Sequence, residues 1–208
     1  MTLEELVQRA RTLAAGPRRI LGIAGAPGAG KSTLATRIAA EVGPCALAVP
    51  MDGFHLADVE LRRLGRRDRK GAPDTFDVLG YIALLRRIRE QTGDIVYAPA
   101  FERDIEEPIA GSIPVGPGIS LVITEGNYLL HDQDPWPQVR PLLDECWWIE
   151  LDGQPRRARL IERHVQFGKP RPLAREWVEG SDERNAQTVR DGVRRADLVV
   201  RGDLPGLT

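Results

Sequence analysis

The sequence predicts a three-layer α/β sandwich, in which a parallel five-stranded core sheet carries helices on both faces and a helical lid. Short apolar runs alternate with helical patterns along the 208 residues, and glycines stand where a run meets a helix. Such alternation is typical of parallel sheets, because each strand must return through a crossover, usually a helix. The first of these junctions, residues 25–32, adds a glycine-rich turn between a buried strand and a helix.

The N-terminal part of the chain begins with a predicted amphipathic helix over residues 2–15. Thr2 and Glu5 fit a capping box, and Gly16 and Pro17 end the helix. Turn residues also bound the apolar runs that follow, as expected of buried strands. The next predicted elements are a strand at 20–24, a helix at 33–40 and a strand at 45–51.

The middle of the chain is predicted to hold a helix that begins after a cap at Asp77 and runs to Gln91. The expected core-facing stripe of this helix is Leu79, Ile82, Leu85 and Ile88. A strand follows at 94–101, and residues 102–108 are polar and expected at the surface.

The rest of the chain again alternates apolar runs with charged helical patterns, and no repeat or linker divides it. Residues 1–208 are therefore expected to form one domain. Trp147 and Trp148 lie on a predicted strand, where at least one of them should be in the core. The expected elements are strands at 119–126, 146–151 and 196–200, a proline-interrupted helix at 136–145, and helices from 155 and at 181–195.

Residues 25–32 read Gly-Ala-Pro-Gly-Ala-Gly-Lys-Ser, the pattern of a phosphate-binding P-loop. Glycines let backbone N–H groups turn toward phosphate oxygens, and the helix N-terminus adds partial positive charge. A glycine-rich helix entry with a solvated lysine is the alternative, which the flanking strand and helix disfavour. The motif predicts a P-loop NTPase fold with an ATP site at Gly25, Ala26, Pro27, Gly28, Ala29, Gly30, Lys31, Ser32 and Thr33.

Two acidic residues stand at the ends of predicted strands. Asp52 follows the strand at 45–51, at the edge where open α/β sheets bind ligands. Glu125 ends an apolar run, as expected of the Walker B acid that supports Mg²⁺, although a plain strand terminus is the alternative. The Ser32 hydroxyl is placed to bind the same ion. Ser32 and Glu125 are therefore the predicted metal ligands.

Two stretches of the chain are strongly basic. Residues 62–70 form either a solvated face or a flap near an anionic substrate or product, and the sequence leaves both interpretations open. Arg159 and Arg163 are four residues apart and share one helix face. Beside an ATP site, that face predicts a lid over the phosphates, at about residues 156–180.

The overall composition excludes several classes of protein. A formal charge of −1 gives no reason to expect nucleic-acid binding. Cys45 and Cys146 begin apolar runs, which favours buried thiols over a disulfide framework. The N-terminus lacks the apolar stretch of a signal peptide, and no run approaches the ~20 apolar residues of a membrane span. The sequence predicts a cytoplasmic protein without membrane insertion, and leaves its oligomeric state open, a homodimer included.

Motifs spread over most of the chain resemble the P-loop kinases of the phosphoribulokinase, uridine kinase and bacterial pantothenate kinase family. Within this family, residues 97–103 and 106–108 are similar to bacterial proteins labelled nucleoside-kinase-like or fructose transport system kinase. The resemblance implies an ATP- and Mg²⁺-dependent kinase that phosphorylates a hydroxyl group of a small-molecule acceptor. The matching stretches are residues 25–32, 52–54, 70–77, 122–126, 159–163 and 196–200.

The resemblance also implies a role for each matching side chain. Asp52 matches a general base that takes the proton from the acceptor hydroxyl, and Glu125 matches the acid that orients Mg²⁺. Arg163 matches a lid residue that neutralises the transferring phosphoryl group. Arg159, Lys169 and Arg171 are further lid cations, and which of them closes on the phosphates stays open. The implied catalytic residues are Asp52, Lys31, Arg163 and Glu125.

The acceptor is the least constrained part of this interpretation. Tyr97 matches an aromatic residue near the acceptor, but Phe101 and Arg103 occupy the region where nucleoside kinases carry a histidine. His55 either touches the acceptor or packs beside its loop, whereas His164 is expected to be a solvated lid residue and His131 a turn residue. The implied acceptor-binding residues are Asp52, His55, Tyr97, Phe101 and Arg103.

The sequence therefore predicts an ATP-dependent kinase for a sugar or sugar-like metabolite. A nucleoside or pantothenate acceptor is the alternative within the family. A regulatory ATPase without an acceptor is the alternative from another class. The regulatory ATPase is disfavoured because the chain lacks the Asn-Lys-x-Asp stretch with which switch proteins recognise guanine. Asp52 would also have no role in such a protein.

Overall fold

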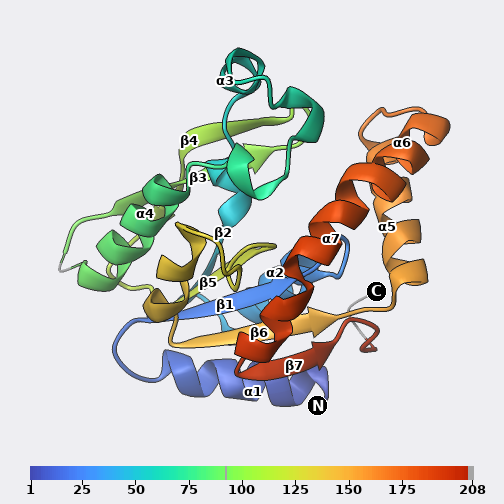
Figure 1. The fold of residues 1–208 in the computed structure, drawn as a ribbon. Helices are drawn as coiled ribbons and strands as arrows, with labels where there is room; N and C mark the ends of the chain where they lie inside the picture. Colours follow the sequence, from blue (N-terminus) through green and yellow to red (C-terminus); the bar gives the residue numbers. More distant parts are fainter. Residues whose placement is uncertain (92, 206–208) are drawn as a thin grey trace.

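The computed structural model describes residues 1–91 and 93–205, and five parallel strands form its central sheet. The strand order is β2-β5-β1-β6-β7 (Figure 1), so the strand that leads into the P-loop lies in the middle. The predicted parallel five-stranded sheet is confirmed. Its strands are β1 (Arg19–Gly25), β2 (Ala46–Pro50), β5 (Leu121–Gly126), β6 (Glu145–Glu150) and β7 (Leu198–Arg201).

The strands of this sheet are hydrophobic on both faces, because helices cover both. In β6 both Trp147 and Trp148 are buried, one in each of two hydrophobic clusters on opposite faces. Cys146 is buried in the same strand, whereas Cys45, just before β2, is only partly buried. The prediction of two buried cysteines is therefore right for Cys146 alone.

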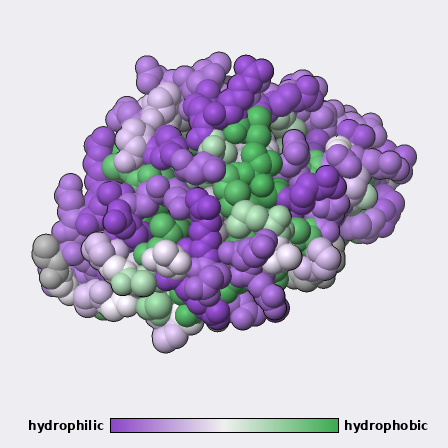
Figure 2. All heavy atoms as spheres, turned by 90° about the horizontal axis from the view of Figure 1, so that it is seen from below, coloured by the Kyte–Doolittle hydropathy of each residue, from purple (hydrophilic) through white to green (hydrophobic). Residues whose placement is uncertain are grey.

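On one face, α1 (Leu3–Ala14) and α2 (Lys31–Val42) pack against the sheet. The predicted capping box of α1 is present, because Thr2 Oγ1 accepts the N–H of Glu5 and the Glu5 carboxylate accepts the N–H of Thr2. Seen from the side of α1, the surface is largely hydrophilic and is interrupted by hydrophobic patches (Figure 2).

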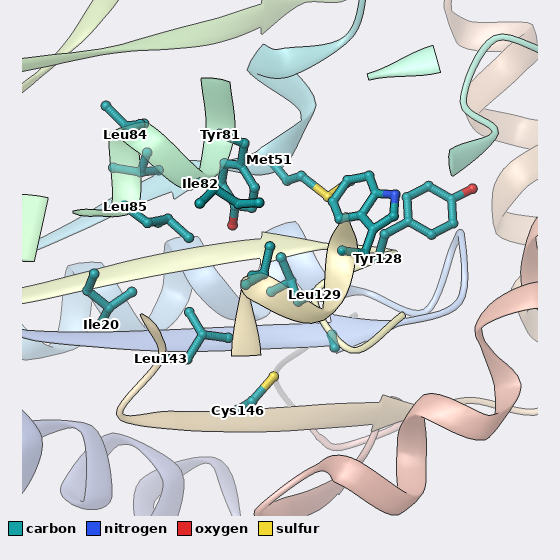
Figure 3. Close-up of a cluster of buried hydrophobic side chains, with 14 of the residues drawn as sticks. Ile20, Met51, Tyr81, Ile82, Leu84, Leu85, Tyr128, Leu129, Leu143 and Cys146 are labelled. Atoms are coloured by element: carbon teal, nitrogen blue, oxygen red, sulfur yellow. The ribbon is translucent and has the colours of Figure 1, made fainter. Parts of the chain in front are cut away.

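On the other face, α4 (Val78–Glu90) begins after Asp77, whose carboxylate accepts the N–H of Gly80. Tyr81, Ile82 and Leu85 point from this helix toward the sheet (Figure 3). Leu79 is 62% exposed, so its place in the predicted stripe is wrong. The buried face instead begins at Val78, because 3.6 residues per turn place positions 78, 81, 82 and 85 on one side.

Residues 136–145 do not form the predicted helix. They contain two short 3-10 turns, Trp136–Gln138 and Arg140–Leu142. Pro141 lacks the N–H group that a helix continuing from Trp136 would donate, so the first turn does not run on through the second. Trp136 is nevertheless buried and packs against the ring of Tyr128.

A two-stranded antiparallel hairpin, β3 (Val96–Glu102) and β4 (Glu107–Val115), stands apart from the core sheet (Figure 1). β3 agrees with its prediction, but β4 begins inside the segment expected to be only a polar surface stretch. The sequence pattern of a strand is weak in β4, because prolines and a glycine interrupt it. The helix α3 (Asp58–Arg63) lies beside the tip of this hairpin, where the Asp58 N–H donates to the Glu107 carboxylate.

Across from the hairpin, the C-terminal part of the chain forms a helical arm of α5 (Gly153–Gln166), α6 (Arg171–Trp177) and α7 (Glu183–Val189) (Figure 1). A π-helical turn, Val178–Asp182, joins α6 to α7. The predicted helix at 181–195 is thus only partly α-helical, and it ends in a 3-10 turn over Arg190–Arg195. In the part of the chain that the structure describes, no helix is long and apolar enough to cross a membrane.

Candidate active site

A cavity of about 330 Å³ lies where the carboxyl ends of β1, β2 and β5 meet the hairpin and the helical arm. Its walls come from residues 27–32, 52–71, 101–106, 125–127 and 163–185, which are far apart in the sequence. The cavity brings together most of the predicted site residues. These are Pro27, Gly28, Lys31, Ser32, Asp52, His55, Phe101, Arg103, Glu125 and Arg163.

The P-loop forms the floor of one end of the cavity. Gly28 has a φ of +78°, and a Cβ there would lie 2.7 Å from Leu160 Cγ, so the turn requires glycine for both conformation and space. Lys31 is buried, and its ammonium donates to Asn127 Oδ1 at 2.7 Å and to the Ala26 carbonyl at 3.1 Å. Burial lowers the pKa of Lys31 to about 8.

Beside the lysine, the Ser32 hydroxyl donates to Glu125 Oε1 at 2.7 Å. Burial raises the pKa of Glu125, and the negative charge of Asp52 raises that pKa further. A divalent cation would favour the ionised carboxylate, so these two oxygen ligands fit Mg²⁺. Within the described residues, no group of three or more His, Cys, Asp or Glu could hold a metal ion.

Asp52 lies in a 3-10 turn, Met51–Phe54, directly after β2. A Cβ at Gly53 would be 2.4 Å from the Pro99 carbonyl oxygen, so this turn packs directly against the hairpin. Arg103, from the hairpin, places Nη2 3.6 Å from Asp52 Oδ2. The carboxylate therefore lies between the core sheet and the hairpin, on the wall of the cavity.

His55 follows this turn and lines the cavity while packing between two aromatic rings. Its Nδ1 is 2.8 Å from the Asp52 carbonyl oxygen, and its ring lies 4.1 Å from that of Phe76 and 4.8 Å from that of Phe101. Burial lowers the pKa of His55, which favours the neutral ring. The side chain therefore supports the loop of Asp52 and also forms part of the wall.

Outside the P-loop segment, two predicted site residues do not line the cavity, Tyr97 and Arg159. Within that segment, Gly25, Ala26, Ala29, Gly30 and Thr33 are not part of the lining either. Tyr97 is 55% exposed, because its neighbours Val96 and Ala98 turn to the buried face of β3 and a strand alternates its faces. Arg159 donates from Nη1 to the Gly202 carbonyl at 3.3 Å and lies next to Gly30 of the P-loop, outside the cavity lining.

Arg163, one turn further along α5, does line the cavity. Burial lowers its pKa, and the like charge of Arg103 lowers that pKa further. His164 was expected in solvent, but it also lines the cavity and places Nε2 3.0 Å from Asp182 Oδ2, so that prediction is wrong. His131 follows a turn as predicted, yet its side chain is buried.

Sequence reasoning missed several residues of the site. Asn127 could have been found, because it directly follows the predicted Walker B segment. Arg156 is buried on α5 and donates to the Pro27 carbonyl at 3.2 Å and to Glu183, a contact without a sequence signal. Asn185, on α7, donates to the Gly71 carbonyl at 3.2 Å, which links the helical arm to the segment after α3.

Comparisons with known proteins agree with this geometry. No protein-family model matches the chain. It is 32% identical to the Schizosaccharomyces pombe protein named "Putative uridine kinase C227.14", over 95% of this chain and 89% of that protein. It is 36% identical to "ATP-dependent kinase-like protein notR'" of Aspergillus versicolor, over 57% of this chain and 73% of that protein.

A solved structure gives a similar result. The crystal structure of a "putative fructose transport system kinase" from Silicibacter sp. TM1040 matches 96% of this chain and 99% of that chain, with 36% identity and a TM-score of 0.87. These similarities extend over most of each relative's own length, and the relatives are named as kinases. The chain is therefore a phosphotransferase that uses a nucleotide, ATP. The chain belongs to the uridine kinase-like P-loop kinases.

Proposed function

We propose that the protein transfers the γ-phosphoryl group of ATP to a hydroxyl group of a sugar or sugar-like metabolite. The observation that carries this proposal is the position of Asp52, whose carboxylate shares one cavity with Lys31 and Ser32 of the P-loop. A carboxylate in this position can take a proton from a hydroxyl group. The similar protein from Silicibacter is named for fructose transport, which supports a sugar, whereas the Schizosaccharomyces pombe relative is named as a uridine kinase, which keeps a nucleoside as the alternative.

In the proposed reaction, the acceptor oxygen attacks the γ-phosphorus while Asp52 takes the proton from the hydroxyl group. A bond forms between the acceptor oxygen and phosphorus, and the bond to the bridging oxygen breaks, so that ADP leaves with the electron pair. Lys31 and Arg163 stabilise the negative charge on the phosphoryl oxygens. Ser32 and Glu125 would hold Mg²⁺, which when bound neutralises charge on the phosphates.

The helical arm would act as the lid of this site, over about residues 156–180. Residues 1–208 would work as one kinase domain. Arg163 and Lys169 line the cavity from the arm and are the lid cations that we propose to meet the phosphates. Arg159 would support the P-loop from the side, because its guanidinium lies next to Gly30.

The test is an ADP-release assay with sugars, nucleosides and pantothenate as acceptors, on the native chain and on Asp52→Asn. We expect release stimulated by a sugar in the native chain and a kcat at least ~100-fold lower in Asp52→Asn, the range for losing a general base. Asp68→Asn is the matched control, because Asp68 is exposed and lies outside the cavity lining. Acceptor-independent release that is equal in all three proteins would favour a regulatory ATPase instead.

A further inference from the structure

Lys70 is a buried lysine that the proposed phosphoryl transfer does not use. Its side chain is only 6% exposed, and its Nζ donates to Asp58 Oδ1 at 2.6 Å and to the Glu106 carbonyl. Nζ also lies 5.4 Å from the centre of the Phe101 ring. An ammonium group has three N–H donors, so these two oxygens leave one donor for the cavity that Lys70 lines.

Arg67 adds a second cation to the same wall. Its Nε donates to Asp58 Oδ2 at 2.5 Å, and no described residue accepts a hydrogen bond from its two terminal nitrogens. Asp58 also pairs with the exposed Arg62 at 3.3 Å, so a single carboxylate serves three cations. Asp58 and Arg62 are not part of the cavity lining, whereas Arg67 and Lys70 are. Two cationic side chains therefore line the cavity at this end, while the carboxylate that they share does not.

The other charged groups at this end have partners or tasks of their own. Asp52 faces Arg103 at 3.6 Å, and the Glu107 carboxylate accepts the N–H of Asp58. Glu106 is the remaining acid of the lining here, and the carboxylate that Arg67 and Lys70 share, Asp58, lies outside the lining.

The position of Arg67 and Lys70 argues against a role in binding ATP. Arg67 and Lys70 make these contacts with α3 and the hairpin. The ribbon of α3 lies well away from that of α2, which follows the P-loop (Figure 1). The phosphate end has its own cations, Lys31 on α2 and Arg163 and Lys169 on the arm. Charged N–H donors form their strongest hydrogen bonds with anionic oxygens, and weaker ones with neutral hydroxyl groups.

We propose that the acceptor carries an anionic group, a carboxylate or a phosphate ester, which binds Arg67 and Lys70 while the hydroxyl group of the acceptor faces Asp52. This inference rests on the proposed function for the role of the hydroxyl group. It narrows the substrate class from sugars in general to sugar acids or sugar phosphates. It also makes Arg67 and Lys70 specificity-determining residues, and thereby favours the flap interpretation for the end of the basic stretch.

The test measures binding separately from turnover, on protein saturated with Mg²⁺ and a non-hydrolysable ATP analogue. Calorimetric titrations compare matched pairs: D-gluconate with D-glucose, D-glycerate with glycerol, and D-fructose 6-phosphate with D-fructose. We expect at least one anionic member to bind at least tenfold more tightly than its neutral counterpart. Comparing the sugar acids with the sugar phosphate then shows whether the site binds a carboxylate or a phosphate ester.

Substitutions in the chain test whether the anion binds at Arg67 and Lys70. Lys70→Gln and Arg67→Gln should each weaken the anion at least tenfold, whereas Arg62→Gln should bind it like the native chain, because Arg62 shares Asp58 but does not line the cavity. Arg67 is partly exposed, so Arg67→Gln remains informative even where Lys70→Gln unfolds. Equal binding by neutral and anionic members, or native-like binding by both variants, overturns the proposal.

Turnover separates this inference from the proposed function. An anion that binds through Lys70 but receives no phosphoryl group supports the anion site and contradicts the proposed kinase reaction on that acceptor. A neutral sugar that is phosphorylated equally well by the native chain and Lys70→Gln supports the kinase and overturns the anion site.

Discussion

Lys31 keeps an ammonium group in the protein interior, where burial opposes its charge. The pKa falls from 10.5 to about 8, which corresponds to roughly 3 kcal/mol against the charged form. Asn127 and the Ala26 carbonyl accept its hydrogen bonds but offset only part of this cost. A charged lysine is what phosphate binding requires, so the residue that we assign to ATP reduces the stability of the fold.

We therefore expect Lys31→Met to lose at least ~100-fold in ATP turnover while unfolding at the same or a higher temperature at pH 7. The effect on stability should depend on pH. Between pH 8 and 10.5 the unfolded chain binds the Lys31 proton and the folded chain does not, so the native protein gains stability as the pH rises. Urea unfolding of both proteins at pH 7 and 9.5 measures this difference, and a stability gap that does not change with pH would contradict the assignment.

Among the secondary-structure elements, α5 does more than carry the lid arginines. It packs against the P-loop, because Leu160 and the Arg156 carbonyl fill the space beside Gly28, and the buried Arg156 guanidinium donates to the Pro27 carbonyl. Arg156 also pairs with Glu183 at the start of α7. One side chain therefore ties the nucleotide loop to two helices of the arm.

Replacing Arg156 with Met should lower the free energy of unfolding by about 2–4 kcal/mol, because Glu183 loses its buried partner. We also expect the KM for ATP to rise several-fold as the P-loop loses its support. Arg157→Met is the matched control, since Arg157 is more exposed and lies 3.7 Å from the same carboxylate. This substitution should lower the free energy of unfolding by less than ~1 kcal/mol. Urea titrations of both variants give the comparison, and equal losses would argue against the anchoring role of Arg156.

At the scale of the whole molecule, the cavity lies between two parts that carry like charges. Arg103 on the hairpin and Arg163 on the arm repel each other: burial lowers the pKa of Arg163, and the like charge of Arg103 lowers that pKa further. An anionic phosphoryl group between them would replace repulsion with two attractions. The hairpin and the arm should therefore approach each other when ATP binds.

Spin labels at Ile105→Cys and Leu173→Cys, both exposed, can measure this approach in a Cys45→Ser background. Cys146 can stay, since it is buried and its pKa is raised to about 12 by burial, which leaves its thiol unreactive. We expect the distance between the labels to shorten with a non-hydrolysable ATP analogue, less so with ADP, and not at all in Arg103→Ala. The same shortening in Arg103→Ala would mean that charge at the hairpin does not drive closure.

The sequence alone determined the parallel sheet, the P-loop and the caps of α1 and α4. These features depend on local patterns: glycines at a turn, apolar runs and a capping residue at a set spacing. Local pattern also placed Lys31, Ser32, Asp52 and Glu125 correctly in one cavity, because each stands at or just beyond the carboxyl end of a parallel strand, and these ends meet at the same edge of the sheet. Their chemical roles stay predictions.

Only the tertiary structure decided which other residues join them. Arg156 meets Pro27 across 129 residues of sequence, and Asn185 meets Gly71 across 114, so no local pattern could pair them. Tyr97 stays outside because the alternation of β3 turns it away, and Lys70 enters because α3 and the hairpin close around it. The physical reason is that local propensity sets the elements, whereas packing between distant elements sets which side chains are buried together and what charge they present.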